Sequence, residues 1–284
     1  MDQSTTRFAR AKRASAKEKT LSDKSVDLRS LLHNDRFPRS NRYDPHWVIE
    51  NEMGPNALWL TESLCEVMDL KPGMRVLDMG CGRGLSSVFL AREFDVEVWA
   101  TDLWGKPTDN WQRFRQAGVQ DRVIPIHADA RSLPYPDQFF DAIVCVDSYV
   151  YYGTDDLYLN YFVKFVKPGG QIGIVVPALT QEFDGPIPEH LTRKQQSGGV
   201  FWDEECWYLH TADWWRHLWA RTGLVDVAVA DAMPDGWRLW LQHYRAVVAA
   251  GTKRSVSDIE ALEADGGRYL GFVRMIARRY PQRQ

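Results

Sequence analysis

The stretch Arg75–Gly84 constrains the fold more than any other part of the chain. It reads Arg-Val-Leu-Asp-Met-Gly-Cys-Gly-Arg-Gly, so a short apolar run ends in an acid and three glycines follow at alternate positions. Residues 85–92 then have a helical pattern. Glycine permits positive φ and leaves room for a ligand against the backbone, and a helix N-terminus offers free N–H groups to an anionic group. The stretch therefore predicts a buried strand, a tight turn and a helix start that together form a ligand site.

A second predicted strand, 96–101, ends in Asp102, 18 residues after Gly84. An acid at this place can accept hydrogen bonds from a ribose diol, as in nucleotide-binding βαβ units, so we expect an adenosine-containing ligand. The glycines run G-x-G-x-G instead of the dinucleotide pattern G-x-G-x-x-G, and Asp78 precedes them, which disfavours a pyrophosphate. A ligand with an ammonium and a carboxylate fits better, because one end can face the acid and the other the helix N-terminus.

Strand and helix patterns alternate along most of the chain. This alternation predicts an α/β fold, in which a parallel sheet carries helices on both faces and the crossovers are right-handed. It breaks at 178–210, a segment rich in Pro, Gly and charge, and long irregular segments of this kind are usually functional. The predicted strands are 74–79, 96–101, 123–128, 141–147, 171–177, 225–231 and 269–277; helices are predicted at 211–222, at 236–249 and from a capping box at 257–260.

These landmarks, in this order, resemble the class I S-adenosylmethionine-dependent methyltransferases over roughly residues 45–280. Val76–Gly84 matches that family's first motif, and Asp102 stands where its ribose-binding acid stands. His127–Ala130 follows the third strand, where the family reads the adenine, and Val166–Gly170 is the turn into the fifth strand. The resemblance implies a Rossmann-like, doubly wound sheet of seven mostly parallel strands with an antiparallel last strand, plus a helical cap and lid. It also implies S-adenosyl-L-methionine as the cofactor.

For the methionine end of that cofactor, the resemblance points to the glycine turn. Gly80, Gly82 and Gly84 would line it, and Asp78 would support the ammonium directly or through water. Cys81 lies within the same loop. It is either a small residue in a tight turn or a reactive thiol, and we expect the first.

For the adenosine end, the resemblance points to the next two strand ends. Asp102 would take the ribose hydroxyls, with Leu103 or Trp104 against the adenine face. Asp129 would accept from the adenine amino group, and Ala130 would offer its backbone N–H. The alternative for Asp129 is a turn cap after the third strand.

Residues 147–152, after the fourth strand, are expected to face the transferred methyl group, because open parallel sheets bind ligands at the carboxyl ends of their strands. Asp147 would also touch the cofactor. Tyr149 and Tyr152 are candidate catalytic residues and Tyr151 a candidate substrate contact; the alternative is that the tyrosines only pack the cap. The segment lacks the Asn/Asp-Pro-Pro-aromatic motif of enzymes that methylate bases or Gln side chains, which counts against those substrates.

Two other segments should fold over the strand ends and supply further candidates. Glu52 in the cap and His190 in the lid are candidate catalytic groups, and Glu182 is a candidate substrate contact. For each one alone we expect a solvated surface role, and they gain weight only as a set. Trp202 and Trp207 are candidate walls of an aromatic or cation-binding pocket. Trp215 and Trp219, one turn apart, are expected to be the buried face of their helix.

Composition limits the partners. The formal net charge of −3 argues against a broad nucleic-acid surface, and no apolar run of membrane-spanning length occurs. The start of the chain lacks a signal-peptide pattern. The four cysteines have no metal-ligand spacing, so we expect no metal and a cytoplasmic, reducing setting.

Three parts are expected. Residues 1–40 hold a basic cluster without apolar periodicity and are predicted to form a flexible tail, with a nucleic-acid arm as the alternative. Residues 41–73 are predicted to form N-terminal cap helices. Residues 74–280 are predicted to form the S-adenosylmethionine-binding domain, with the substrate lid at about 178–210.

The predicted function is methyl transfer from S-adenosylmethionine to a small-molecule acceptor by in-line displacement. Amine, hydroxyl and carbon acceptors remain open. The alternatives are a lipid methyl or methylene transferase of the same fold, a non-catalytic S-adenosylmethionine-binding protein, and an NAD-dependent dehydrogenase, which the glycine spacing disfavours.

Overall fold

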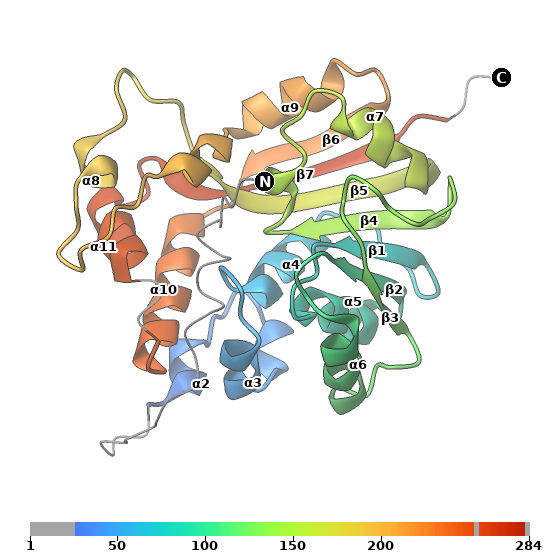
Figure 1. Ribbon diagram of the computed structural model, residues 1–284, viewed down its shortest axis with the longest axis horizontal. Coiled ribbons are helices and arrows are strands. Elements are labelled where there is room, and N and C mark those ends of the chain that lie inside the picture. Colours follow the sequence, from blue (N-terminus) through green and yellow to red (C-terminus); the bar gives the residue numbers. More distant parts are fainter. Residues whose placement is uncertain (1–25, 253–255, 282–284) are drawn as a thin grey trace, which may run out of the picture.

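A seven-stranded sheet forms the centre of the molecule (Figure 1). The computed structural model describes residues 26–252 and 256–281 of the 284-residue chain. The strands lie in the order β3-β2-β1-β4-β5-β7-β6. They are β1 (Arg75–Met79), β2 (Glu97–Asp102), β3 (Val123–His127), β4 (Phe140–Val146), β5 (Val166–Leu179), β6 (Val225–Ala232) and β7 (Leu270–Arg279).

The first five strands are mutually parallel, and β7 runs antiparallel to both β5 and β6. The predicted α/β class, the doubly wound sheet and the antiparallel last strand are therefore confirmed. Parallel strands buried on both faces read as continuous apolar runs, which is why the inner strands could be recognised. Most strand boundaries differ from the predicted ones by one or two residues. The largest difference is in β5, which begins at Val166 instead of 171, because Val166 pairs with Phe140 before an irregularity in the ladder.

Helices cover both faces of the sheet, and each face has its own apolar core. On one face lie α4 (Ala57–Cys65), α5 (Leu85–Phe94) and α10 (Gly236–Ala249); on the other lie α7 (Tyr158–Phe162) and α9 (Ala212–Ala220) (Figure 1). Trp215 and Trp219 of α9 are fully buried, as their helical spacing predicted. Three more elements lie between the first five strands in the chain: the helix α6 (Pro107–Gln116) and the short 3₁₀ helices η3 (Tyr149–Tyr151) and η4 (Val163–Phe165).

The N-terminal part packs against the domain and starts earlier than predicted. It comprises α2 (Leu28–Leu31), η2 (Ser40–Arg42), α3 (Pro45–Glu50) and α4. Phe37 is fully buried and stacks on Trp59 of α4, and the backbone N–H of Ser40 donates to the Glu62 carboxylate. The prediction of a flexible tail is therefore wrong for residues 26–40; its basic cluster, in residues 1–25, lies outside the described residues.

The segment after β5 is irregular, as predicted, and contains α8 (Glu189–Thr192) and η5 (Glu204–Tyr208). It lies beside α10 and α11 (Val256–Asp265), at the end of the sheet where β5 finishes (Figure 1). Ser257 lies inside α11 and does not precede it as a cap. Over the described ranges, no helix is both long and apolar enough to cross a membrane.

Candidate functional site

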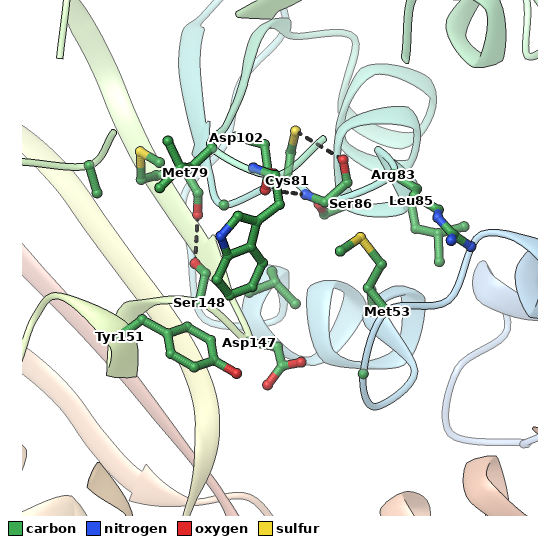
Figure 2. A pocket seen from close by; sticks show the side chains of 18 of the residues that line it. Met53, Met79, Cys81, Arg83, Leu85, Ser86, Asp102, Asp147, Ser148 and Tyr151 are labelled. Carbon is green, nitrogen blue, oxygen red and sulfur yellow. Dashed lines mark hydrogen bonds between the residues drawn. The ribbon is translucent and has the colours of Figure 1, made fainter. Parts of the chain in front are cut away.

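A cavity of about 440 Å³ lies at the carboxyl ends of β1, β2 and β4. The glycine turn between β1 and α5 forms one part of the wall, and the loop at 51–55, between α3 and α4, forms another. Figure 2 shows Asp102 and Cys81 on one side of the cavity, Asp147 and Tyr151 on the other, and Met53 reaching in from the loop. The volume falls within the usual range for small-molecule sites, and the position is the one that open parallel sheets use for ligands.

The glycine turn has a backbone that few other residues could adopt. Gly80, Gly82 and Gly84 have φ of +77°, +55° and +83°, in the left-handed region that favours glycine. A Cβ on Gly84 would lie 2.4 Å from the Phe114 ring, and one on Gly82 would lie 2.9 Å from the Met53 sulfur. The turn leads directly into α5, whose N-terminus carries no side-chain cap from the described residues and so presents free N–H groups beside the cavity.

Asp78 lies behind this turn and does not line the cavity. It is fully buried, and its Oδ2 accepts hydrogen bonds of 2.6 Å from the hydroxyls of Ser86 and Ser87. Its Oδ1 is buried and has no hydrogen-bond partner among the described residues. Burial raises the pKa of this carboxyl to about 6, and the two serine hydroxyls oppose the rise. A buried carboxylate with one unsatisfied oxygen is costly, and a cation nearby would relieve that cost.

Asp102 closes β2 and organises both neighbouring loops. Its Oδ2 accepts from the backbone N–H of Gly82 at 2.8 Å. Its Oδ1 accepts from the backbone N–H of Trp104 at 2.7 Å and from that of Gly105. Carboxylate oxygens carry about four lone-pair sites in all, so the group can still accept from a ligand on its cavity side. Cys81 beside it is buried, and burial, Asp102 and Asp78 together raise the pKa of its thiol well above the ordinary value. This thiol is therefore a packing group in a tight turn.

The predicted adenine-binding residues line the same cavity. Leu103, Trp104, Asp129 and Ala130 all contribute to its wall. The Asp129 Oδ1 accepts from the backbone N–H of Arg131 at 2.8 Å, so this carboxylate does cap a turn, as the alternative held, while it also faces the cavity. The Trp104 ring packs edge-on against Tyr151, with 5.6 Å between the ring centroids.

Asp147 and Gly54 meet where the two walls approach. Asp147 follows β4 with a φ of +53°, an uncommon conformation for a residue with a side chain, and one that occurs at functional sites. A Cβ on Gly54 would lie 2.1 Å from the Asp147 Oδ2, so glycine at position 54 lets the carboxylate approach the cap loop. Ser148 donates from its Oγ to the Met79 carbonyl at 2.6 Å and lies 3.0 Å from the Tyr152 hydroxyl, which ties the ends of β1 and β4 together.

The strand-end tyrosines divide between two places. Tyr151 and Tyr152 line the cavity. Tyr149 does not: it is fully buried under α9, with ring centroids 5.6 Å from Trp215 and 5.5 Å from Trp219. Burial raises the pKa of Tyr149 well above its ordinary value, so it is a neutral core residue that does not reach the cavity.

None of the candidates from the outer segments is part of the wall of this cavity. His190 pairs with the buried Asp265 at 3.0 Å, and the Glu182 carboxylate accepts from the Thr211 hydroxyl at 2.9 Å. Trp202 packs against Phe183. Two further residues are also absent from the cavity wall: Trp207, which is 67% exposed, and Glu52, which adjoins Met53 in the chain.

Several wall residues were not anticipated. Three of them, Met53, Gly54 and Pro55, come from the cap loop. Arg83 comes from the glycine turn, and Arg131 comes from the turn that Asp129 caps. The Met-Gly-Pro-Asn run at 53–56 interrupts a helical stretch, and Gly-Pro is a turn signal, so the break between α3 and α4 could have been found. Among the described residues, no cluster of His, Cys, Asp and Glu could hold a metal ion.

A second cavity, of about 120 Å³, adjoins the first. Pro55, Asp147 and Tyr151 line both cavities. Val150 and Pro177 also line the smaller cavity, and its remaining wall is formed by α10, by α11 and by residues 201–209 of the segment predicted as a lid. The predicted lid therefore closes the smaller cavity and leaves the larger one to the cap loop.

The strand order, the antiparallel β7, the glycine turn and the acid that ends β2 together define the fold of the class I methyltransferases. Comparison with known proteins agrees: residues 76–170 match the family model described as a methyltransferase domain. The chain thus has the class I methyltransferase fold, and residues 76–170 are similar to a methyltransferase domain.

Three relatives illustrate the similarity. "Methyltransferase GfsG" of Streptomyces halstedii is 34% identical over 116 residues, 40% of this chain and 42% of that protein. Phosphoethanolamine N-methyltransferase 1 of Arabidopsis thaliana is 36% identical over 160 residues, 55% of this chain and 32% of that protein. The crystallised Haemonchus contortus phosphoethanolamine N-methyltransferase 2 in complex with S-adenosyl-L-methionine has a TM-score of 0.65 at 18% identity, covering 90% of this chain and 60% of that one. The chain thus spans less than half the length of these two curated relatives.

Proposed function

We propose that this protein is an S-adenosylmethionine-dependent methyltransferase that methylates a small molecule. The observation that carries the proposal is the placement of Asp102, Asp129 and the glycine turn around one cavity of about 440 Å³. The methyltransferase-domain match over 76–170 and the neighbour crystallised with S-adenosyl-L-methionine support the same reading.

The residues present suit each part of that cofactor. Asp102 would accept from the ribose hydroxyls, and Asp129 from the adenine amino group. The uncapped N-terminus of α5 would receive the carboxylate of the methionine part. The orphaned Oδ1 of Asp78 makes the turn favourable for the ammonium, although the burial of Asp78 means that this attraction acts through the turn or through water.

When bound, the cofactor supplies a methyl group that its sulfonium has already activated. The protein then has to hold the acceptor in line with it, and such positioning can supply several kcal/mol. The two cavities share Asp147 and Tyr151, and Tyr152 lines the larger cavity nearby. We infer that these three residues position the acceptor there. The nearby Tyr149 supports α9 and takes no direct part.

The setting is proposed to be cytoplasmic, with no nucleic-acid partner. All four cysteines are free and buried, which suits a reducing compartment. The formal net charge of −3 disfavours a nucleic-acid surface.

Calorimetric titration with S-adenosylhomocysteine tests the cofactor assignment. Asp102→Ala should weaken binding on the order of 100-fold, because a charge-assisted hydrogen bond from the ribose is lost. Asp226→Ala, an exposed carboxylate on β6, should change nothing. Because Asp102 also holds backbone N–H groups, the titration is repeated with the 2′-deoxy analogue. The loss of affinity caused by Asp102→Ala should be smaller for this analogue than for S-adenosylhomocysteine. An equal loss of affinity for both ligands would mean that the ribose lies elsewhere.

A further inference from the structure

Two arginines hold the end of α3 beside the glycine turn. Arg83, within the turn, donates from its Nη1 to the backbone carbonyl of Glu50 at 2.7 Å. Arg113, on α6, donates from its Nε to the Asn51 Oδ1 at 2.8 Å. The last carbonyls of a helix have no partner within the helix, and arginine side chains can supply one. The two arginines therefore hold consecutive residues at the point where α3 passes into the cap loop.

Asn51 is the residue of the cap loop that Arg113 contacts. It is buried, and it contributes to the wall of the larger cavity. Its amide nitrogen donates to the Trp47 carbonyl at 2.8 Å, while its amide oxygen accepts from Arg113. Because a guanidinium group only donates hydrogen bonds, the amide oxygen has to face it. Arg113 thus orients a residue of the cavity wall without lining the cavity itself.

The same guanidinium group reaches the glycine turn through Asn110. Its Nη1 donates to the Asn110 Oδ1 at 2.9 Å, and the Asn110 Nδ2 donates to the Gly82 carbonyl at 2.9 Å. On its other side, Gly82 donates its backbone N–H to Asp102. Side chains therefore hold both polar backbone groups of this glycine, and Arg113 orients one of the two side chains.

Asn51, Arg113 and Asn110 are called here the polar bridge. A guanidinium group carries its N–H donors in a rigid, planar fork, so one arm can meet Asn51 while another meets Asn110. Burial lowers the pKa of Arg113, and the charge of Arg83 adds to the shift. The cation has thus lost part of its water, and the two amide oxygens replace it. Hydrogen bonds to a charged group are stronger than those between neutral groups, so the bridge resists displacement of either amide.

The polar bridge lies next to the closest approach of the cap loop to the glycine turn. Met53 follows Asn51 by two residues, and a Cβ on Gly82 would lie 2.9 Å from the Met53 sulfur. Figure 2 shows the Met53 side chain extending from the cap loop toward Ser86 at the start of α5. A displacement of Asn51 would therefore move Met53 away from the turn that would hold the methionine end of the cofactor.

Resting on the proposed function, we propose that Arg113 is a positioning residue that keeps the cap loop and the glycine turn closed around the bound cofactor and so slows its release. Arg113 acts through Asn51 and Asn110, and it lines neither of the two cavities. Without it, the two amide oxygens lose their donor and the cap loop is free to move away from the turn. Changes around a binding site mostly alter the rate of dissociation, so release is the step that should respond.

Surface plasmon resonance with the immobilised full-length protein measures both rate constants for S-adenosylhomocysteine. Arg113→Met keeps an unbranched apolar stem but removes the donors, and it should raise the dissociation rate constant about tenfold. The association rate constant should stay within about twofold. Arg115→Met, the same change at an exposed position of α6, should alter neither constant. An unchanged dissociation rate constant in Arg113→Met overturns the proposal.

The dissociation rate constant separates positioning from a merely structural role. It is a property of folded molecules that have bound the ligand, so a smaller folded fraction alone leaves it unchanged. Arg113→Lys is a milder second test, because it keeps the charge but lacks the planar fork. It should still raise the dissociation rate constant at least about threefold, and release at the unmodified rate would show that the fork is not required and overturn the proposal.

A double variant tests whether the effect passes through Asn51. Asn51→Ala and Arg113→Met break the same bridge, so the double variant should release the ligand at most about twofold faster than the faster single variant. Effects that multiply in the double variant would overturn the proposal. If the unmodified protein does not bind S-adenosylhomocysteine, the proposed function and this inference fail together. Normal binding with unchanged release from both Arg113 variants overturns only the inference.

Discussion

Replacement of Asp78 by Asn tests whether the ionised, buried carboxylate behind the glycine turn lowers the stability of the fold. The carboxyl has an ordinary pKa of 3.8 and a pKa of about 6 in the folded protein, with burial as the main cause. A raised pKa of an acid means that the folded state holds its proton more tightly than the unfolded chain does. The contribution of this group to stability is therefore fully present below pH 3.8 and is lost as the pH rises through about 6.

The size of the effect follows from that shift. Each pKa unit corresponds to 1.36 kcal/mol, so the ionised carboxylate destabilises the fold by about 3 kcal/mol at pH 7 to 8. Asp78→Asn removes the ionisation but keeps an oxygen that can accept from Ser86 and Ser87. The stability of the variant relative to the unmodified protein should rise by about 2–3 kcal/mol between pH 4 and pH 7, because part of the effect is already present at pH 4; this corresponds to roughly 5–10 °C in Tm for a chain of this size.

The assay is denaturant unfolding of both proteins at a series of pH values, each analysed as the difference between variant and unmodified protein. The difference cancels the other titrating groups, provided that they are not coupled to Asp78. The same variant should bind S-adenosylhomocysteine more weakly, since the charge that favours the ammonium is gone. A stability difference that does not change between pH 4 and pH 7 would refute the reasoning about Asp78.

Two further predictions concern groups around the site. His243 is fully buried with both ring nitrogens unpartnered among the described residues, and burial lowers its pKa to about 4. The unmodified protein should therefore lose about 3 kcal/mol of stability relative to His243→Leu as the pH falls from 6.5 to 4. Denaturant unfolding that shows no such loss would contradict this prediction. Gly84→Ala should cost about 2–4 kcal/mol and weaken cofactor binding, because it adds a methyl group 2.4 Å from Phe114 at a φ of +83°. Gly118→Ala, at a φ of +66° with nothing within 4 Å of the added carbon, should cost only about 1–2 kcal/mol; equal losses in Tm for the two variants would show that the contact with Phe114 is unimportant.

The fold could be predicted from the sequence because its signals are local. Each inner strand is a continuous apolar run, and the Gly80–Gly84 turn can be recognised because a positive φ there requires glycine. Asp102 was found because it ends a strand at a fixed distance from that turn. Gly80, Gly82 and Asp102 line the cavity where the pattern placed them. Gly84 and Asp78 are not in its wall: Gly84 packs beside Phe114, and Asp78 is buried behind the turn.

The remainder depended on packing between distant segments. Tyr149 and Tyr151 are two residues apart after the same strand, yet one is buried under α9 and the other lines both cavities. Both belong to the 3₁₀ helix η3, which is too short to show a periodic pattern of apolar residues. His190 was a plausible catalytic residue until the structure placed it against Asp265, 75 residues further along the chain. The burial of Phe37 was missed because the helices around it span only one or two turns, too short for an amphipathic pattern.

The most direct test of the account is a crystal structure of the full-length protein with S-adenosylhomocysteine. Density for the ligand is expected in the cavity of about 440 Å³, with its ribose hydroxyls on Asp102, its adenine beside Asp129 and its sulfur toward Asp147 and Tyr151. Ligand density in any other place, or a cavity that takes NAD and refuses S-adenosylhomocysteine, would contradict the account.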